Sequence, residues 1–263
     1  MKPEVLTNRI TRLEIPYKDI FTSVYAVKTN CGALLFDAGS YDSDVTEFIL
    51  PFLNELGITH KDLKYIFISH KHPDHSGGLS ALLRAFPNTT DVTRSDKLKE
   101  ALDGYSVYTP KDGESLLDGL QVIAIPGHTK DSCGLLDTFD QTLISGDSLQ
   151  MYGIYGSGKW GAAISLPHSH FKALEKLESL DVNRILTAHN YHPMRYDCQG
   201  RGAVTSVIAS CRNALEEIIE LIQKHYSLTD SEIADLYTSK GYPTLHERVV
   251  IKLREYLNSF ETK

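Results

Sequence analysis

The sequence contains little cysteine, no excess of basic residues and no long apolar run. Its four cysteines, at positions 31, 133, 198 and 211, lie far apart and form no CxxC pair, so a dense disulfide framework is not expected. Lysine and arginine number 27 against 34 aspartates and glutamates, a formal net charge of −7. This balance gives no support to a general affinity for nucleic acid. No apolar stretch is long enough to predict a membrane span.

The N-terminal segment, residues 1–17, lacks the apolar core of a secretory signal. We therefore expect a cytoplasmic protein with reduced thiols and no membrane partner. The composition, with 41% hydrophobic and 23% charged residues, is that of a globular protein with a sizeable core. The length fits one large domain or one domain with an appendage.

Short apolar runs of strand type alternate with turns and helices over the first two thirds of the chain. The predicted strands lie at 13–15, 23–27, 32–37, 65–69, 121–125, 142–145 and 183–188, and the predicted helices at 45–56, 79–86 and 171–180,. After about residue 203 the pattern is only helical, with a long amphipathic helix over 204–222 and a capping box at Thr229-x-x-Glu232,. We predict one domain over 1–202 and a helical appendage over 203–263.

Eleven histidines are the unusual feature of the composition, and several follow predicted strands. The segment His70-x-His72-x-Asp74-His75 comes directly after the apolar run 65–69. Alternation in extended backbone places His70 and His72 on the same side, where two imidazoles can share one metal ion. Asp74 and His75 follow where the chain turns toward a helix, so they can serve a neighbouring position. The Gly-Gly pair that comes next permits a tight passage into that helix.

Three further candidate ligands, His128, Asp147 and His189, occupy equivalent places after later predicted strands. Because the ends of parallel strands gather at one edge of a sheet, we expect these side chains to meet there. Imidazole and carboxylate without thiolate suit catalytic zinc, iron or manganese better than a closed structural zinc site.

The segment from His70 to His75 resembles the signature of the metallo-β-lactamase-fold superfamily, whose later ligand positions match His128, Asp147 and His189 in order and approximate spacing,. Asp37, in Phe36-Asp37-Ala38-Gly39, matches its usual Asp-x-Gly turn. The resemblance covers about residues 10 to 195. It implies an α+β protein, a four-layer αβ/βα sandwich, with the catalytic domain over 1–202 and a C-terminal helical appendage.

The same resemblance implies two divalent metal ions, for which zinc is favoured and iron or manganese are alternatives. His70, His72 and His128 would hold the first ion, Asp74, His75 and His189 the second, and Asp147 would bridge both. Asp74 would also orient the nucleophile or relay a proton. Asp37 would either hold a ligand imidazole by accepting its other N–H or simply form a turn.

Two cations about 3.5–4 Å apart would activate a bridging hydroxide. We expect hydrolysis of a small ester-like substrate, a thioester, lactone or related acyl compound. The acidic charge, the complete donor set and the helical tail, which also follows the core of glyoxalase-II-like hydrolases and some carrier-protein thioesterases, favour this class. The last ligand lies in Ala188-His189-Asn190-Tyr191, which departs from the Gly-His-Gly of many thioesterases, and no obvious basic cluster would grip a glutathione carboxylate.

Two other activities of the same fold remain open. The helical tail faintly resembles the appendage of small endoribonucleases, although the acidic charge and the lack of a long RNA-processing insert argue against phosphodiester or RNA cleavage. The other is redox chemistry at iron by a mono-iron dioxygenase, as in persulfide dioxygenases. We expect a small molecule rather than a nucleic acid as the partner, and a homodimer is compatible with the sequence.

The segment 151–166 follows Asp147 and carries Tyr152, Tyr155 and Trp160 among glycines. It predicts either a mobile lid over the metals or ordinary aromatic packing. His192 is expected in a surface turn or at the pocket wall, and His168 and His170 as helix caps or pocket rim.

Overall fold

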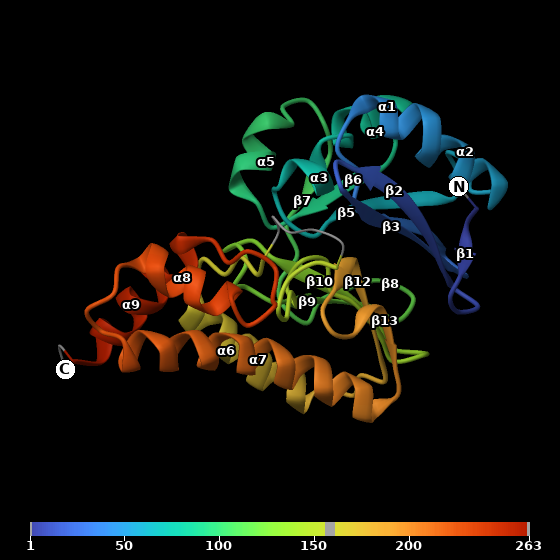
Figure 1. Ribbon diagram of the computed structural model, residues 1–263. Coiled ribbons are helices and arrows are strands. Elements are labelled where there is room, and N and C mark those ends of the chain that lie inside the picture. Colours follow the sequence, from blue (N-terminus) through green and yellow to red (C-terminus); the bar gives the residue numbers. More distant parts are fainter. Residues whose placement is uncertain (1, 156–160, 262–263) are drawn as a thin grey trace. The chain divides into compact units, whose positions relative to one another are not determined.

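The computed structural model describes residues 2–155 and 161–261 (Figure 1). The chain divides into two compact units, the first made of residues 1–124 and 133–140 and the second of residues 125–132 and 141–263. Among the described residues, no helix combines the length and the apolar character needed to cross a membrane.

The first unit is built on a seven-stranded sheet in which the strands are ordered as in the sequence. The strands are β1 (Glu4–Val5), β2 (Ile10–Tyr17), β3 (Ile20–Thr29), β4 (Gly32–Phe36), β5 (Leu63–Ile68), β6 (Thr90–Thr93) and β7 (Val107–Tyr108). Neighbours from β1 to β4 are antiparallel, and neighbours from β4 to β7 are parallel. The buried strand predicted at 65–69 is confirmed as β5.

Helices cover one face of this sheet with an apolar layer. They are α1 (Asp42–Asp44), a π-helical turn over Val45–Ile49, α2 (Leu50–Glu55), α3 (Pro73–Ser76), α4 (Leu79–Ala85) and α5 (Asp96–Ala101). The helix predicted over 45–56 is therefore interrupted. The Leu50 N–H donates to the Val45 carbonyl five residues back, directly before Pro51, which has no N–H to donate.

The first unit also contains an antiparallel ladder of three strands, β8 (Ser115–Leu117), β9 (Leu120–Ala124) and β10 (Cys133–Asp137). His128 follows β9, which is antiparallel to both of these neighbours. The expectation that every candidate ligand follows a strand of a parallel set is therefore wrong for His128. Hydrophobic periodicity locates a strand but does not reveal the direction of its partners.

The second unit contains β11 (Thr142–Ile144), β12 (Arg184–Tyr191) and β13 (Arg195–Gln199). β11 and β12 are parallel, and β13 returns antiparallel to β12. The strand predicted over 183–188 continues to Tyr191, which pairs with Arg195 after an irregularity in register. His189 thus lies inside β12 rather than at its end.

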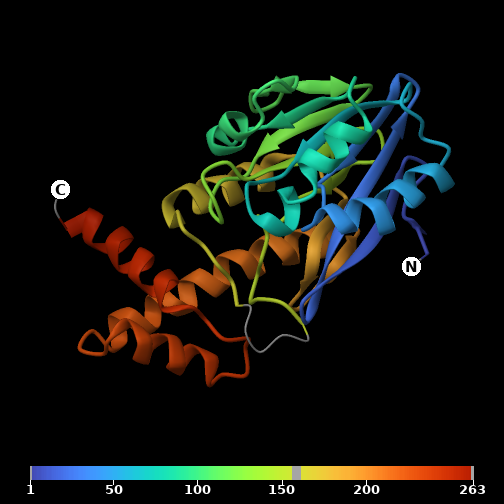
Figure 2. The same ribbon diagram turned by 90° about the horizontal axis from the view of Figure 1, so that it is seen from above.

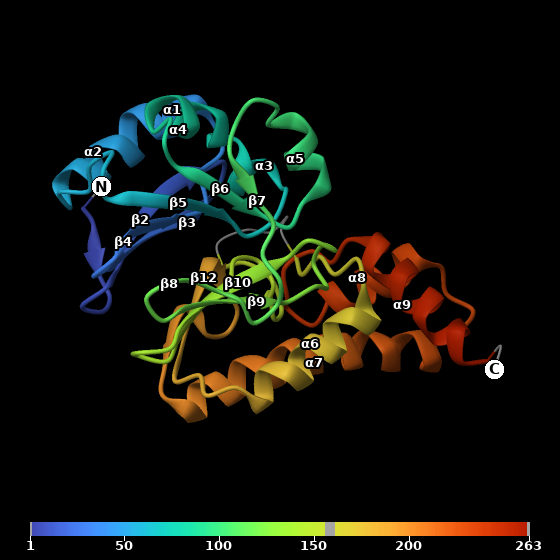
Figure 3. The same cartoon turned by 180° about the vertical axis from the view of Figure 1, so that it is seen from behind.

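The described residues of the second unit also form the helices α6 (Pro167–Ser179), α7 (Arg201–Lys224), α8 (Asp230–Thr238) and α9 (Glu247–Glu261). α6 and α7 lie side by side (Figures 1 and 3), and α9 runs to the C-terminal end of the chain (Figure 2). Ile218, Ile233 and Val250 join α7, α8 and α9 in one apolar core. The predicted helical C-terminal region is confirmed, and its capping box forms, since Thr229 Oγ1 accepts from the Glu232 N–H at 3.3 Å.

Asp91 is a buried acid in the apolar part of the first unit. It lies on β6 in register with Ile66 and Val107, and its exposed fraction is 0%. Burial raises the pKa of Asp91 from 3.8 to about 7, and the Val92 backbone N–H offsets this only in part. The folded protein therefore retains a proton that the unfolded chain releases at lower pH. The free energy of unfolding should fall as the pH rises from about 4 to about 7.

We predict that the free energy of unfolding of Asp91→Asn, measured relative to that of wild type, rises by roughly 3 kcal/mol from pH 5 to pH 8. The reason is that wild type loses stability as Asp91 ionises, whereas the variant has no carboxylate at this position. Urea unfolding of both proteins at the two pH values measures this difference. Asp62→Asn is the control, since hydrogen bonds from Thr59 lower the pKa of Asp62 and keep it ionised throughout this range. The prediction would be contradicted if Asp91→Asn and wild type differed in unfolding free energy by the same amount at pH 5 and at pH 8.

Candidate metal centre

A close approach of two backbone segments brings the first group of candidate ligands to the end of the sheet. The Ala38 N–H donates to the His75 carbonyl at 2.7 Å, and the Gly78 N–H donates to the Gly39 carbonyl at 3.3 Å. A Cβ atom at Gly77 would lie 1.9 Å from the Ser40 carbonyl oxygen. The Gly-Gly pair therefore permits the tight passage that the sequence predicts, because a side chain would separate the two segments.

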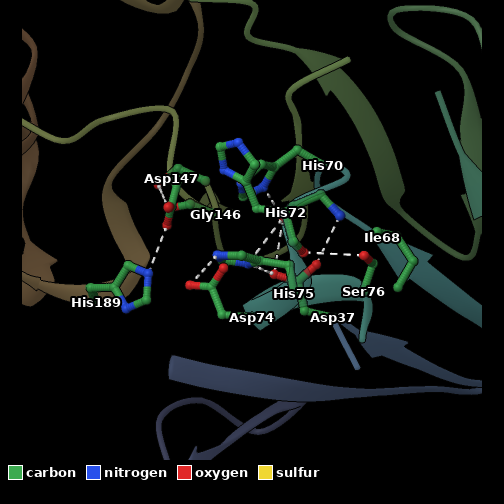
Figure 4. A network of polar contacts seen from close by, with 12 residues as sticks. Asp37, Ile68, His70, His72, Asp74, His75, Ser76, Gly146, Asp147 and His189 are labelled. Carbon is green, nitrogen blue, oxygen red and sulfur yellow. Dashed lines mark hydrogen bonds and ion pairs between the residues drawn. The ribbon is translucent and has the colours of Figure 1, made fainter. Parts of the chain in front are cut away.

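His70 and His72 converge as their spacing predicts. They follow β5, with His72 in extended backbone, and His70 Nε2 lies 2.9 Å from His72 Nδ1 (Figure 4). Two nitrogen ligands of a tetrahedral zinc ion lie about 3.3 Å apart, so these ring nitrogens are close to the separation that a shared ion requires.

His75 is held by a buried carboxylate. It lies on α3, and its Nδ1 is 2.7 Å from Asp37 Oδ2, with both side chains 0% exposed. Burial raises the pKa of Asp37, and the His75 ring and hydrogen bonds from Ser69 oppose this rise. The Ser69 backbone N–H donates to Asp37 Oδ1 at 2.8 Å. When His75 Nδ1 carries the proton that Asp37 accepts, Nε2 has the lone pair that a metal needs.

Asp37 thus does both things that the sequence left open. It occupies a left-handed turn, with φ of 65°, and it orients a candidate ligand. Asp74, one residue before His75 on α3, lies with Oδ2 3.5 Å from His75 Nε2 and is 14% exposed. The carboxylate and the imidazole nitrogen therefore face a common point near the surface.

The second unit holds the other three candidate ligands, and in it His128 and His189 face Asp147. Gly146, with φ of 56°, turns the chain after β11, and its carbonyl accepts from the Ala188 N–H of β12 at 3.2 Å. Asp147 Oδ1 lies 3.3 Å from His189 Nε2 (Figure 4), and Oδ2 lies 3.7 Å from His128 Nε2. Each carboxylate oxygen thus faces a different imidazole.

His128 has its ring orientation fixed in the same way as His75. Its Nδ1 lies 2.6 Å from the Ala163 carbonyl and 2.9 Å from Gln150 Nε2. In the tautomer whose Nδ1 donates to the carbonyl, the shorter of the two contacts, Nε2 has the lone pair that a metal needs. The Gln150 side chain bridges the two residues, since its Oε1 accepts from the Ala163 N–H and its Nε2 is the nitrogen beside the His128 ring.

The donor chemistry of both clusters fits a divalent metal. The five imidazoles and two carboxylates are ligand types of catalytic zinc, iron and manganese sites. Cys198 and Cys211 offer no competing thiolate, because burial raises the pKa of Cys198 to about 11 and that of Cys211 to about 12. Each cluster is assembled within its own unit: His70, His72, Asp74 and His75 in the first, and His128, Asp147 and His189 in the second.

Other histidines singled out by the sequence have different places. His170 is 1% exposed on α6, and burial lowers its pKa to about 4. A Cβ at Gly127 would lie 2.3 Å from His170 Nδ1, so this neutral ring supports the backbone that carries His128. His168 is exposed near the start of the same helix.

The aromatic residues of the predicted lid pack within the second unit where they are described. Tyr152 stacks on Tyr242 with ring centroids 4.6 Å apart, and Tyr155 stacks on His192 at 3.4 Å. Burial lowers the pKa of the His192 imidazole. Trp160 and the neighbouring positions 156–159 lie outside the described residues.

The sequence interpretation missed Tyr191. Its ring is fully buried, and its hydroxyl donates to Asp147 Oδ1 at 2.8 Å. The available signal was its position two residues after His189, because alternation along a strand places both side chains on one face.

We predict that Asp37→Asn weakens metal binding at His75 by about 10–100-fold. The Ser69 N–H would hold the amide oxygen, so the amide NH2 would face His75 Nδ1 and favour the tautomer with a proton on Nε2. Zinc titration of the metal-free protein measures the effect. Asp44→Asn is a control, since Asp44 is a buried carboxylate that instead accepts from the Ser40 and Tyr41 N–H groups. Equal zinc affinity in Asp37→Asn and wild type would refute the tautomer argument.

Comparisons with known proteins agree with the motif and the fold. The family model of the Metallo-beta-lactamase superfamily matches residues 17–189. The Beta-lactamase-like protein 2 homolog of Caenorhabditis elegans is 25% identical over 247 residues, which cover 88% of this chain and 77% of that protein. Hydroxyacylglutathione hydrolase 1 of Vibrio vulnificus is 29% identical over 163 residues, which cover 60% of this chain and 61% of that enzyme.

A crystal structure of a metallo-beta-lactamase family protein from Thermus thermophilus matches with a TM-score of 0.69 at 17% identity, covering 97% of this chain and 95% of that one. This likeness concerns the fold, and it confirms the predicted α+β class with sheets, helices and a helical C-terminal region. The family match spans more than half of the chain and includes all seven candidate ligands. The chain therefore belongs to the metallo-beta-lactamase superfamily and is, as its sequence predicts, a metal-dependent hydrolase of that superfamily.

Proposed function

We propose that this protein is a dinuclear-metal-dependent hydrolase of a small ester-like substrate: a thioester, lactone or related acyl compound. In this proposal zinc is the metal, with iron and manganese as alternatives. His70, His72 and His128 hold the first ion, Asp74, His75 and His189 hold the second, and Asp147 bridges them.

The orientation of the Asp147 carboxylate is the observation that supports this assignment most directly. Its two oxygens face different imidazoles, Oδ2 toward His128 and Oδ1 toward His189, as a bridging ligand between two ions would. Asp37 and the Ala163 carbonyl each hold the Nδ1 side of one candidate ligand ring. This support directs Nε2 of His75 and His128 toward their metals.

When bound, the metal ions would lower the pKa of a shared water and polarise the substrate oxygen. Asp74, which is partly exposed beside His75, would orient that water and accept or relay its proton. The buried Cys198 and Cys211 thiols remain protonated at neutral pH because their pKa values are raised to about 11 and about 12. These two thiols therefore do not serve as competing nucleophiles.

The substrate class is supported by the relatives and by charge. One relative with 29% identity bears the name of a hydroxyacylglutathione hydrolase. The net charge of −7 disfavours a polyanionic substrate. We further propose a cytoplasmic location and a small-molecule substrate, with neither a membrane nor a nucleic acid as partner, and a homodimer is compatible with this function.

Metal-loaded protein assayed on thioesters, lactones, a phosphodiester and a persulfide tests the substrate class. We expect turnover of a thioester or lactone, loss of turnover after chelation and recovery when zinc is returned. Turnover confined to the phosphodiester, or oxygen consumption with the persulfide by the iron-loaded protein, would replace the proposed reaction with one of the two alternatives.

We predict that His72→Ala removes most of the bound metal and nearly all hydrolytic activity, because it deletes one of the converging nitrogens of the first ion. Metal content by inductively coupled plasma mass spectrometry provides the measurement. The control is His225→Ala, which alters the histidine at the C-terminal end of α7, outside the proposed donor set. Retention of two metals per chain in His72→Ala would count against the ligand assignment.

A further inference from the structure

The Tyr191 hydroxyl makes a specific contact with the proposed bridging carboxylate. It donates to Asp147 Oδ1 at 2.8 Å, and the Tyr191 side chain is 0% exposed. The same oxygen lies 3.3 Å from His189 Nε2. One carboxylate oxygen therefore receives both the tyrosine hydrogen bond and the approach of a candidate ligand of the second ion.

The backbone leaves Tyr191 little freedom to move. The residue ends β12, pairs with Arg195 of β13 and forms an isolated bridge with Ile154. Its ring meets the His189 ring edge-on, with centroids 5.8 Å apart and an interplanar angle of 85°. Tyr191 and His189 thus form one rigid pair on the same strand, and both reach the same oxygen.

The other carboxylate oxygen has a different environment. Asp147 Oδ2 faces His128 Nε2 at 3.7 Å, on the side of the first proposed ion. A hydrogen bond to Oδ1 prevents the carboxylate from rotating about its Cβ–Cγ bond. It thereby keeps a lone pair of Oδ1 directed toward the position beside His189, while Oδ2 remains toward His128.

We propose that Tyr191 is a positioning residue that sets how tightly the second metal ion is held. The inference rests on the proposed dinuclear function and adds to it a residue outside the set of ligands. Hydrogen-bond partners of metal ligands typically contribute 10–100-fold to metal affinity. Loss of the Tyr191 hydroxyl should therefore weaken the second binding step selectively, since the hydroxyl donates to Oδ1, the oxygen that faces His189 of the second ion.

The test is a zinc titration of metal-free wild type, Tyr191→Phe and Tyr237→Phe, against a chromophoric chelator and without any substrate. Tyr237 is a matched control, because it is also a fully buried tyrosine of the second unit, and its hydroxyl has no hydrogen-bond partner in the described part of the chain. Asp147→Asn serves as the positive control for a weakened second step.

We expect wild type and Tyr237→Phe each to bind two zinc ions per chain, and the affinity of each binding step to be the same in the two proteins. Tyr191→Phe should bind the first ion within about threefold of wild type and the second about 10–100-fold more weakly. The first step also reports on folding, because His128 and Asp147 belong to the same unit as Tyr191.

Each contrary result has a distinct meaning. If wild type binds two ions and Tyr191→Phe binds both with wild-type affinity, the role of Tyr191 is overturned while the proposed function stands. Equal weakening of both steps in Tyr191→Phe would also overturn the selective role. If wild type binds fewer than two ions, the dinuclear function itself fails, and the inference fails with it.

Discussion

The position of one carboxylate, that of Asp147, constrains the candidate metal site of the second unit. Three segments distant in sequence meet at this group: the loop that carries His128, the turn after β11 and the strand β12. The two oxygens face His128 and His189 at 3.7 and 3.3 Å. A bridging ligand must present its oxygens in two directions at once, and neither imidazole can replace it because each has only one nitrogen available there.

In both units a hydrogen-bond acceptor at Nδ1 orients the ring of a candidate ligand. In the first unit Asp37 holds His75 through Nδ1, and in the second the Ala163 carbonyl holds His128 through Nδ1. An imidazole whose Nδ1 donates a hydrogen bond has its lone pair on Nε2, so these two acceptors favour the metal-binding tautomer before any metal arrives. Close backbone packing at Gly77 and Gly127 supports these arrangements, since a side chain at either position would collide with its neighbour.

Several features of the fold and of the candidate site could be predicted from the sequence, because they depend on residues that are close together in it. The strand β5, the convergence of His70 and His72, the glycine pair and the capping box at Thr229 each depend on residues a few positions apart. The features that the sequence did not reveal depend on distant partners. The antiparallel neighbours of β9, the extension of β12 to Tyr191 and the contact between Tyr191 and Asp147 all require knowledge of which segments lie together. The buried acid Asp91 was equally hidden, because its strand pattern does not show what covers it.

In the proposed function, seven side chains, five histidines and two aspartates, hold two metal ions. Anomalous diffraction at the zinc edge from crystals grown with zinc tests it most directly. We expect two anomalous peaks per chain, about 3.5–4 Å apart, with Asp147 contacting both and with His128 and His189 bound to different ions. A single peak, or peaks coordinated by other side chains, would contradict it.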